Sequence, residues 1–361
     1  YTFDAAGNTT CYEDPLGNKT QYTYDAEGRL TQVLDPLGRK TRYEYDAYDN
    51  VIAITDAKGR QQTAEYSPDR LLEKATTRDG CTYEYSYDKR GQLTQVKDQQ
   101  GRTIQRAYDA LGRLTAVTYP EGENAKFGYD PAMNLTKVSN GGKAFTTTHD
   151  AANRALGLKD AEGNTITDIE RNALGLPTRL RDRVGRTFTF EYNHANLPVR
   201  ATMPGGIEAE AEYDAAGRLT KLVDPNGNET RYEYNALGAV SAETDAHGNK
   251  WQYSYDPAGR LESVQRPDGA MVAFSYDGGG RLVKKDVVDG NDTAAIRYTY
   301  DETDNVLSIR DSVYEQGIAY TYGKNDQLSR RTGAFGNAVQ YEYDKRENVT
   351  AVIYPDGKRV D

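Results

Sequence analysis

Aspartate residues recur along this chain at intervals of about 21 residues, and paired carboxylates are the groups that hydrolyse glycosidic bonds. A stacked sheet could bring two of them within the separation that such catalysis uses. Catalysis, however, needs one asymmetric pair whose pKa values differ, whereas the copies in this chain are interchangeable. We therefore expect these aspartates to be turn residues, and we predict no catalytic residue and no enzymatic activity.

Few other groups could bind a metal or act as a nucleophile. The histidines are His149, His194 and His247. They fall in or near predicted turns and lack the spacing of metal ligands or of a nucleophile with its base. Cys11 and Cys81 show no CxxC pattern, so neither a disulfide framework nor a zinc site is indicated. The acidic stretch 286–292 lacks the ligand order of an EF-hand loop, and we expect no metal and no cofactor.

The composition excludes several classes of protein. A net charge of −10 and a pI near 5.1 argue against nucleic acid as a partner. No apolar run approaches the roughly 18 residues that a membrane helix needs, so we predict no membrane insertion. Disordered chains usually combine few aromatics with a strong net charge, and this chain has neither. With 29 tyrosines and few aliphatic residues, it should fold around a thin or tyrosine-rich core.

A sequence repeat predicts the structural elements that position these residues. A Tyr-Asp pair, or a degenerate version of it, gives seventeen anchors, and twelve of the sixteen steps between them are 21 residues long. A fixed period of this kind is typical of an array in which each unit buries its apolar side against its neighbours. The widest step, from Tyr276 to Tyr300, contains a polar insert that we expect to be a loop over residues 286–296. Because the sequence begins and ends inside a repeat phrase, we expect 1–361 to be a single array cut from a longer chain.

Each unit contains two turns of the same chemistry. Asp25 to Gly28 and Asp35 to Gly38 both have Asp at the first position and Gly at the fourth, which is type I turn chemistry. The fourth residue should take the left-handed conformation and form a bulge. The same positions recur at Gly217, Asp224 and Gly227. Asn or Asp, which tolerate positive φ, replace Gly at Asp49, Asn153, Asn196, Asp304 and Asp326, whereas Met133 and Glu347 break this rule.

Two turns per unit imply two short strands. The second strand reads Thr-Arg-Tyr-Glu-Tyr, and its alternation predicts a half-buried strand with Thr and both Tyr on one face. These tyrosines are Tyr43 and Tyr45, and again Tyr232 and Tyr234. In the first strand Leu30 and Val33 are three positions apart, so either both faces are partly covered or a bulge redirects Leu30. No stretch of ten or more residues combines helical periodicity with helix caps.

The predicted fold is therefore all-β. About 17 hairpins give about 34 strands, and open twisted sheets rarely exceed about ten strands without curling. We predict tandem hairpin repeats of about 21 residues in one continuous sheet that coils into a spiral or barrel-like shell. A β-propeller is the alternative, because two units match the length of a four-stranded blade. Odd and even units look alike, which favours the coiled sheet.

The phrase Gly-Arg-Leu-Thr-x-Val-x-Asp-Pro-x-Gly-x-x-Thr-x-Tyr-x-Tyr-Asp at residues 28–46 resembles the YD repeat of the Rhs family, and the resemblance spans essentially the whole chain. Such repeats occur in bacterial polymorphic toxins, toxin-complex shell subunits, wall-associated proteins and teneurins. The resemblance implies a hollow cocoon of hairpins that, in bacterial members, encloses a toxic C-terminal domain. Neither Asp-Pro-Leu-Gly copy here is followed by the Leu of those relatives' self-cleavage segment, so no protease residue is carried over.

On this resemblance we expect a non-enzymatic shell segment of an Rhs-type protein, secreted or on the bacterial cell surface. Its partners would be a polypeptide toxin or effector cargo and the remaining shell of the parent protein. The alternative is a glycan-binding or cell-surface adhesion module, because exposed tyrosine ladders could stack on sugar rings. A binding site usually shows one unit that departs from the rest, and the uniform repeats favour the wall.

Overall fold

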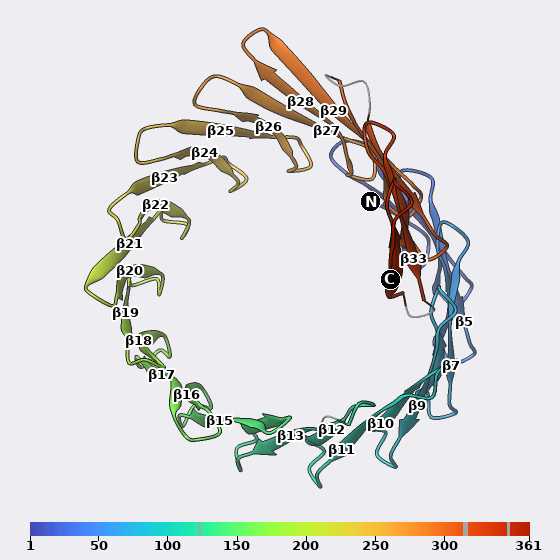
Figure 1. The fold of residues 1–361 in the computed structure, drawn as a ribbon, viewed down its shortest axis with the longest axis horizontal. Coiled ribbons are helices and arrows are strands. Elements are labelled where there is room, and N and C mark those ends of the chain that lie inside the picture. The colour runs from blue at the N-terminus through green and yellow to red at the C-terminus, as the bar shows by residue number, and fades with distance from the viewer. Residues whose placement is uncertain (123, 313–316, 345–346) are drawn as a thin grey trace. The chain divides into compact units, whose positions relative to one another are not determined.

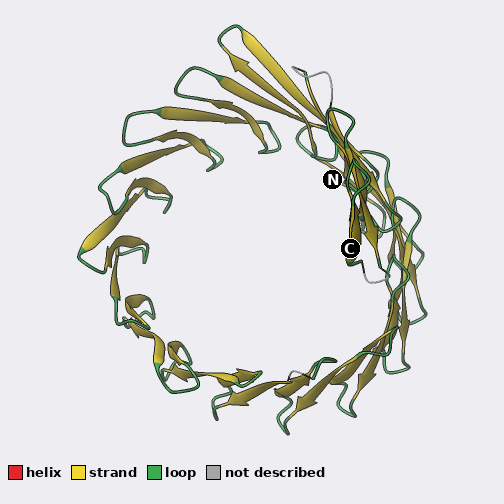
Figure 2. Ribbon diagram, in the orientation of Figure 1, coloured by secondary structure: helices red, strands yellow, loops and turns green. Residues whose placement is uncertain are grey.

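The structure is a computed structural model, and it describes residues 1–122, 124–312, 317–344 and 347–361. Every regular element in this described part is a β-strand, and the strands are joined by short turns (Figure 2). The part of the chain that is described therefore includes no helix able to cross a membrane. The all-β prediction is confirmed.

The chain divides into two compact units. Unit 1 combines Tyr1–Thr82 with Trp251–Asp361, and unit 2 is Tyr83–Lys250. The first strands are β1 (Thr2–Phe3), β2 (Thr9–Glu13), β3 (Lys19–Tyr24), β4 (Leu30–Leu34), β5 (Lys40–Tyr45), β6 (Val51–Thr55), β7 (Gln61–Tyr66) and β8 (Leu72–Thr76). The next are β9 (Thr82–Tyr87), β10 (Leu93–Asp98), β11 (Thr103–Tyr108), β12 (Leu114–Thr118), β13 (Asn124–Tyr129), β14 (Leu135–Asn140), β15 (Lys143–His149), β16 (Ala155–Lys159), β17 (Thr165–Arg171), β18 (Pro177–Asp182), β19 (Thr187–Tyr192), β20 (Pro198–Met203), β21 (Ile207–Tyr213), β22 (Leu219–Val223), β23 (Glu229–Tyr234) and β24 (Val240–Thr244). The last are β25 (Lys250–Tyr255), β26 (Leu261–Gln265), β27 (Met271–Tyr276), β28 (Leu282–Asp289), β29 (Asp292–Tyr300), β30 (Val306–Asp311), β31 (Gly317–Tyr322), β32 (Leu328–Thr332), β33 (Ala338–Tyr343), β34 (Val349–Ile353) and β35 (Arg359–Val360).

Within each unit, every strand pairs antiparallel with the next strand in the chain. In unit 2 this ladder runs without a break from β9 to β24, and Figure 1 shows these strands following one another in chain order. In unit 1 the same pattern of successive pairs runs from β1 through β8 and, separately, from β25 through β35. A propeller would break the ladder after every fourth strand. The hairpin array is therefore confirmed, and the propeller alternative is wrong.

The turns have the geometry that their residues predict. Gly28 lies at φ 81° and Gly38 at φ 79°. The Gly28 amide donates to Asp25 O at 3.1 Å, and the Asp25 amide donates to Arg29 O at 3.0 Å, which closes a type I turn with a bulge. The substituted positions also take positive φ, between 62° and 71°: they are Asp49, Asn153, Asn196, Asp304, Asp326, Met133, Glu347 and Arg70. At Met133, Glu347 and Arg70 the hairpin pairing imposes a conformation that the residue type does not favour.

The bulge also settles the position of Leu30. Tyr24 lies opposite Leu30, Thr23 opposite Gln32, and Tyr22 opposite Val33, so Thr31 is the extra residue on β4. Directly opposite residues of an antiparallel pair point to the same face. Leu30 and Val33 therefore both lie on the tyrosine face, as the bulge alternative requires.

The polar insert between Tyr276 and Tyr300 is not the loop that we expected over 286–296. Strands β28 and β29 pair through it, up to Asp289 opposite Asp292. Val287 and Val288 favour strands, and Gly290, at φ 59°, begins a two-residue turn with Asn291. The extra residues lengthen a hairpin, because valine runs beside a Gly-Asn turn are strand sequence despite their polar neighbours.

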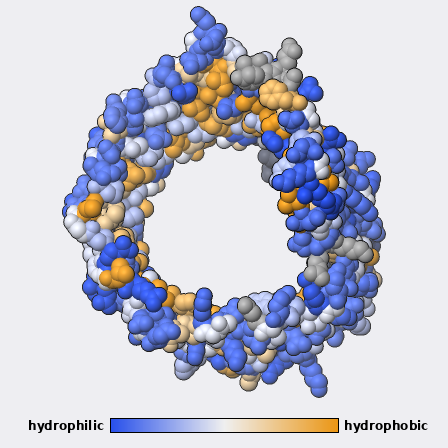
Figure 3. All heavy atoms as spheres, in the orientation of Figure 1, coloured by the Kyte–Doolittle hydropathy of each residue, from blue (hydrophilic) through white to orange (hydrophobic). Residues whose placement is uncertain are grey.

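The sheet has a thin interior. On β5, Thr41, Tyr43 and Tyr45 are half-buried, whereas Lys40, Arg42 and Glu44 are exposed. The buried apolar residues among those described are small: Ala53, Val117, Ala125, Ala242, Ala270, Ala295 and Ala351. Hydrophilic residues cover most of the surface that Figure 3 shows, with small hydrophobic patches between them. Half-buried tyrosine rings therefore provide much of the apolar contact, as the composition predicts.

Candidate functional site

The repeated tyrosine ties each hairpin to the strand before it. The Tyr45 hydroxyl donates to Leu30 O at 2.8 Å, and the Tyr234 hydroxyl donates to Leu219 O at 2.7 Å. The same bond is made by Tyr24, Tyr66, Tyr108, Tyr129, Tyr192, Tyr213, Tyr276, Tyr300, Tyr322 and Tyr343. The acceptor is a carbonyl at the start of a strand, beside the turn bulge. The tyrosine thus buries its ring and satisfies a backbone group with its hydroxyl.

An arginine that we did not single out from the sequence links each turn to the next repeat. Arg29 Nε donates to Asp25 Oδ2 at 2.7 Å, and its Nη1 donates to Asp46 O at 3.0 Å. Its guanidinium carbon lies 5.0 Å from the centre of the Tyr45 ring, which is a cation–π contact. Equivalent contacts place Arg113, Arg218, Arg260 and Arg281 over Tyr129, Tyr234, Tyr276 and Tyr300. The sequence signal was available, because Arg or Asn follows the fourth turn residue wherever the first turn residue is Asp, Gln92 excepted.

The second copy of the predicted residues has the same arrangement. Gly217 and Gly227 take φ 79° and 83°. Asp224 Oδ1 accepts from the amides of Asn226 and Asn228, and Asn228 Nδ2 donates to Asp224 Oδ2, each at 2.8 Å. The hydrogen bond from the Asn228 side chain, with those from the backbone, lowers the pKa of Asp224. Tyr232 is half-buried on β23, and burial raises its pKa.

The structure does not bring the predicted carboxylates together. Asp25 closes the turn between β3 and β4, and Asp35 closes the turn between β4 and β5, so the five residues of β4 separate them. Each carboxylate is held by its own turn amides and by an arginine of that turn, Arg29 or Arg39. This geometry suits turn closure and not an acid–base pair. In the described segments, no group of three or more His, Cys, Asp or Glu side chains could hold a metal.

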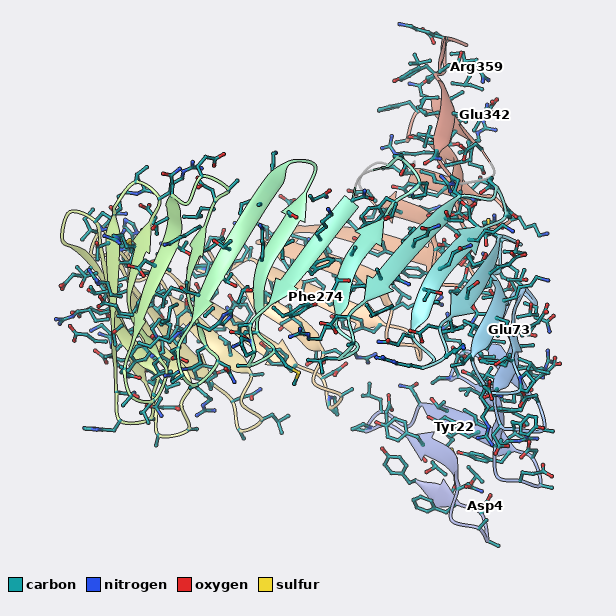
Figure 4. The ribbon with its side chains drawn as sticks, turned by 90° about the horizontal axis from the view of Figure 1, so that it is seen from below. Asp4, Tyr22, Glu73, Phe274, Glu342 and Arg359 are labelled. Atoms are coloured by element: carbon teal, nitrogen blue, oxygen red, sulfur yellow. The ribbon has the colours of Figure 1, made fainter. Side chains whose placement is uncertain are left out.

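The exposed strand residues form ion pairs between strands. Glu342 and Arg359 pair at 2.9 Å on the last hairpins, and both are labelled in Figure 4. Lys97 and Glu84 pair at 2.9 Å across β10 and β9. Pairs of this exposed kind contribute about 0.2–1 kcal/mol each. This face is therefore a solvated surface of alternating charge.

Unit 1 contains an ionic seam, by which we mean the contact of Arg39, Lys58 and Arg60 with Asp301, Asp304 and Asp326. Lys58 Nζ lies 2.6 Å from Asp301 Oδ2 and 2.7 Å from Asp326 Oδ1. Arg60 Nη2 lies 2.7 Å from Asp326 Oδ2, and Arg39 pairs with Asp304. The side chains of Lys58, Asp301 and Asp326 are 22%, 15% and 26% exposed. The turns of the two segments of unit 1 therefore meet through partly buried charges.

The residues of the seam recur at the repeat spacing in both segments of unit 1. Arg39 and Arg60 are 21 residues apart, and their partners Asp304 and Asp326 are 22 apart, so one hairpin meets one hairpin. The turn that contains Gly279, one repeat before the turn of Asp304, also lies close to the turn that contains Leu37. A Cβ added at Gly279 would lie 2.7 Å from Leu37 Cδ1. A side chain at Gly279 would therefore require the Leu37 side chain to move.

The seam carboxylates are held in their ionised form. Burial alone would raise the pKa of Asp326, but contacts with Arg60, Lys58 and Asn305 outweigh it and lower this pKa to about 2. Burial likewise opposes the ionisation of Asp301, and hydrogen bonds from Lys58, Asn305 and the turn amides outweigh it, so its pKa lies well below the usual range. Asp304 and Asp326 were expected only to tolerate positive φ. Their second role depends on partners that sequence spacing does not reveal.

Comparison with known proteins identifies the pattern. The profile of the family described as RHS Repeat matches residues 3–39, 24–61, 87–123, 108–144, 213–250, 234–271 and 320–359, which is more than half of the chain. No curated protein matches the chain significantly.

Solved structures share the fold. A crystal structure of TcdB2-TccC3 superposes with a TM-score of 0.85 at 16% identity, covering 99% of this chain and 24% of that one. A crystal structure of TcdB2-TccC3-Cdc42 gives 0.80 at 16% identity, over 94% of this chain and 22% of that one. The Tc holotoxin pore of Photorhabdus luminescens gives 0.79 at 16% identity, over 94% and 21%. At this identity the likeness shows the fold, and the chain spans about a quarter or less of those chains.

Proposed function

Since the chain belongs to the RHS repeat family, we propose that it is a non-enzymatic segment of a secreted or cell-surface shell that encloses a polypeptide toxin or effector. The sheet would bend into a coil, and the coil would keep proteases away from the enclosed chain. The seam is the observation that carries this proposal. It joins residues near 39–60 to residues near 301–326, so segments far apart in sequence are fastened together.

The hydrogen bonding within each repeat supports this proposal, because the polar side chains find their partners inside the array. In the regular units the tyrosine hydroxyl bonds a neighbouring strand carbonyl, and the turn carboxylate bonds its own turn and the following arginine or asparagine. A module that meets its polar needs within the array can be repeated without a deep core. Neighbour contacts then stabilise the sheet at every step, which is what an extended wall needs.

The same contacts count against the glycan-binding alternative. A sugar would stack on an exposed aromatic face and bond a free hydroxyl. The Arg218 guanidinium covers the Tyr234 ring, 4.7 Å from its centre, and the hydroxyl is already bonded to Leu219 O. Tyr232 is half-buried beside it. We therefore rank shielding above adhesion.

The solved relatives support the proposed cargo only by analogy of fold. They are TcdB2-TccC3 assemblies and a Tc holotoxin pore. A toxin assembly therefore uses the fold, and we propose a toxin-enclosing use here. The toxin or effector, the delivery route and the remaining shell are part of this proposal.

Protection of the cargo from a protease tests the function. A protease recognition sequence would be placed in the cargo of the parent protein and, in a second variant, between Gly290 and Asn291 at the exposed tip of the β28–β29 hairpin. We expect the cargo site to be cut at least tenfold more slowly in the parent protein than in free cargo. The site at the hairpin tip should be cut readily, which shows that the protease is active on this protein. Equal cutting of the cargo site in the parent protein and in free cargo would refute shielding.

A further inference from the structure

One repeat of unit 2 departs from the array at two positions. Gln92 follows a turn that begins with Asp88, whereas every other Asp at this first turn position is followed by Arg or Asn four residues later. Arg106 occupies the position of Tyr43 and Tyr232, which holds Tyr, Phe, Ala, Ile or Thr in all other units. Arg106 is therefore the one charged residue at this strand position, and it lies in the same repeat that lacks the usual turn partner.

These departures leave a donor and an acceptor without their usual partners. Arg106 Nη1 is buried and, within the described residues, has no hydrogen-bond partner. Asp88 Oδ1 accepts from the amides of Arg90 and Gln92 at 2.8 and 3.0 Å. The side-chain Nε2 of Gln92 donates to Gly112 O at 2.9 Å and not to the Asp88 carboxylate. Among the described residues, no side chain donates to Asp88 Oδ2 as Arg29 donates to Asp25 Oδ2.

Both groups line one pocket. This pocket has a volume of about 310 Å³, and Asp88, Arg90, Gln92, Arg106, Tyr108 and Asp109 are among its lining residues. Arg90 Nη1 donates to Ala110 O at 2.8 Å, which fixes the rim to the next hairpin. Asp109 is already paired with Arg113 at 2.7 Å. The groups left to recognise a ligand are Arg106 and Asp88.

A buried donor without a partner is costly, and a guanidinium is relieved most by a carboxylate or a phosphate. The carboxylates of Asp88 and Asp109 also line the pocket, and their charge disfavours a phosphate dianion more than a carboxylate. Asp88 accepts a hydrogen bond from an N–H group. A carboxylate with a neighbouring N–H satisfies both side chains.

We propose that this pocket binds a carboxylate group adjacent to an N–H donor, with Arg106 contacting the carboxylate and Asp88 contacting the N–H. A peptide C-terminus and a free amino acid both present this chemistry. The pocket volume lies at the lower end of the range for small-ligand sites, which suits a group of this size. The site does not depend on the shell function, and it would exist equally in an adhesion protein.

Ligand-observed NMR titration of the whole chain tests the site with small probes. We expect acetylglycine to bind more tightly than acetate, and acetylglycinamide, which lacks the carboxylate, to bind weakest. Inorganic phosphate should bind less tightly than acetate. Comparison of acetylglycine with free glycine separates a peptide C-terminus from an amino acid as the source. Binding of acetylglycinamide as tight as that of acetylglycine, tighter binding of phosphate than of acetate, or no binding of any probe would overturn the proposal.

The chain offers matched variants for this titration. Arg106→Tyr restores the residue that the other repeats use and should weaken acetylglycine binding at least about tenfold, because a charge-assisted pair is lost. Gln92→Arg should also abolish binding, because it restores the guanidinium that pairs with the turn Asp. Asp88→Asn keeps a turn residue that this chain uses at Asn172 and Asn235, and it should retain acetate binding while losing the preference for acetylglycine. Wild-type affinity in Arg106→Tyr would refute the assignment.

In the double variant Tyr43→Arg with Arg106→Tyr, the arginine is moved to a repeat in which Arg29 already pairs with Asp25 and covers Tyr45. The net charge is that of the wild-type chain. Binding should remain lost, because the usual turn partner is present there. Recovery of acetylglycine binding would show that any arginine on this face suffices and would overturn the role of the departing repeat.

Discussion

Reversing the charge of Lys58 should open the ionic seam. Lys58 Nζ contacts Asp301 and Asp326 at 2.6 and 2.7 Å, and these two carboxylates belong to turns more than 240 residues away in sequence. In Lys58→Glu both contacts are lost, and a third carboxylate enters a partly buried group of acids. Arg60 and Arg39 remain, so the seam is weakened and not eliminated.

The magnitude follows from the burial and from the pKa of Asp326. Lowering this pKa from 3.8 to about 2 corresponds to roughly 2 kcal/mol in favour of the ionised form, shared among Arg60, Lys58 and Asn305. Loss of the two Lys58 pairs should therefore cost about 1–2 kcal/mol. The introduced carboxylate adds repulsion of about 1 kcal/mol after side-chain relaxation. We expect Lys58→Glu to weaken the seam by about 2–3 kcal/mol and Lys58→Met by about half as much.

Hydrogen–deuterium exchange measures this opening locally. Exchange should increase in the turns at 56–60, 301–305 and 323–327, and it should not change in the turn at 214–218 of unit 2. Lys74→Glu is the matched control, because Lys74 is 41% exposed and, among the described residues, its ion pair is with Glu65 at 3.1 Å on a neighbouring strand. Unchanged exchange at 301–305 in Lys58→Glu, or an equal increase in Lys74→Glu, would refute the seam as a fastening.

Three further outcomes follow from the repeated module. Tyr234→Phe removes the bond to Leu219 O at 2.7 Å and should lower the free energy of unfolding by about 0.5–1.5 kcal/mol in urea titration, whereas an unchanged midpoint would show that the hydroxyl bond does not matter. Gly28→Ala forces a Cβ into φ 81° and should cost about 1–2 kcal/mol, while Gly28→Asn should cost less; equal costs in thermal unfolding would contradict the left-handed requirement. Acid should weaken the seam in a defined window: the folded pKa of Asp326, about 2, lies below its ordinary value of 3.8, so its contribution is complete above about pH 4 and is lost as the pH falls towards 2. The melting temperature should therefore be steady from pH 7 to pH 5 and fall below pH 4, and a fall already complete at pH 5 would point to other groups.

Local pattern was sufficient to predict the hairpins. Asp25 and Gly28 define a turn within four residues, and the alternation around Tyr43 and Tyr45 defines a strand, so each inference depended on neighbours in sequence. The face on which Leu30 lies could not be predicted from spacing alone. The extra residue of the bulge, Thr31, shifts the alternation between the two faces of the strand by one position. The insert near Gly290 was misread for a related reason: its polarity suggested a loop, but its valines and its turn residues make a longer hairpin.

The seam and the pocket show where sequence reasoning stops. Asp304 satisfies the turn rule, and nothing in its local sequence indicates a partner at Arg39, 265 residues away. Arg106 was visible as a departure from the repeat, but only the structure shows that its Nη1 is buried and that it lines one pocket with Asp88. Contacts between distant repeats depend on how the sheet bends, and a 21-residue pattern does not specify that bend.

The most direct test of the shell is an electron cryo-microscopy map of the parent protein that contains this segment. The account predicts density for an enclosed polypeptide on one side of the sheet formed by β1 to β35, with the seam between Arg39 and Asp304 closed. A map in which both faces of this sheet contact only solvent and no chain is enclosed would contradict it.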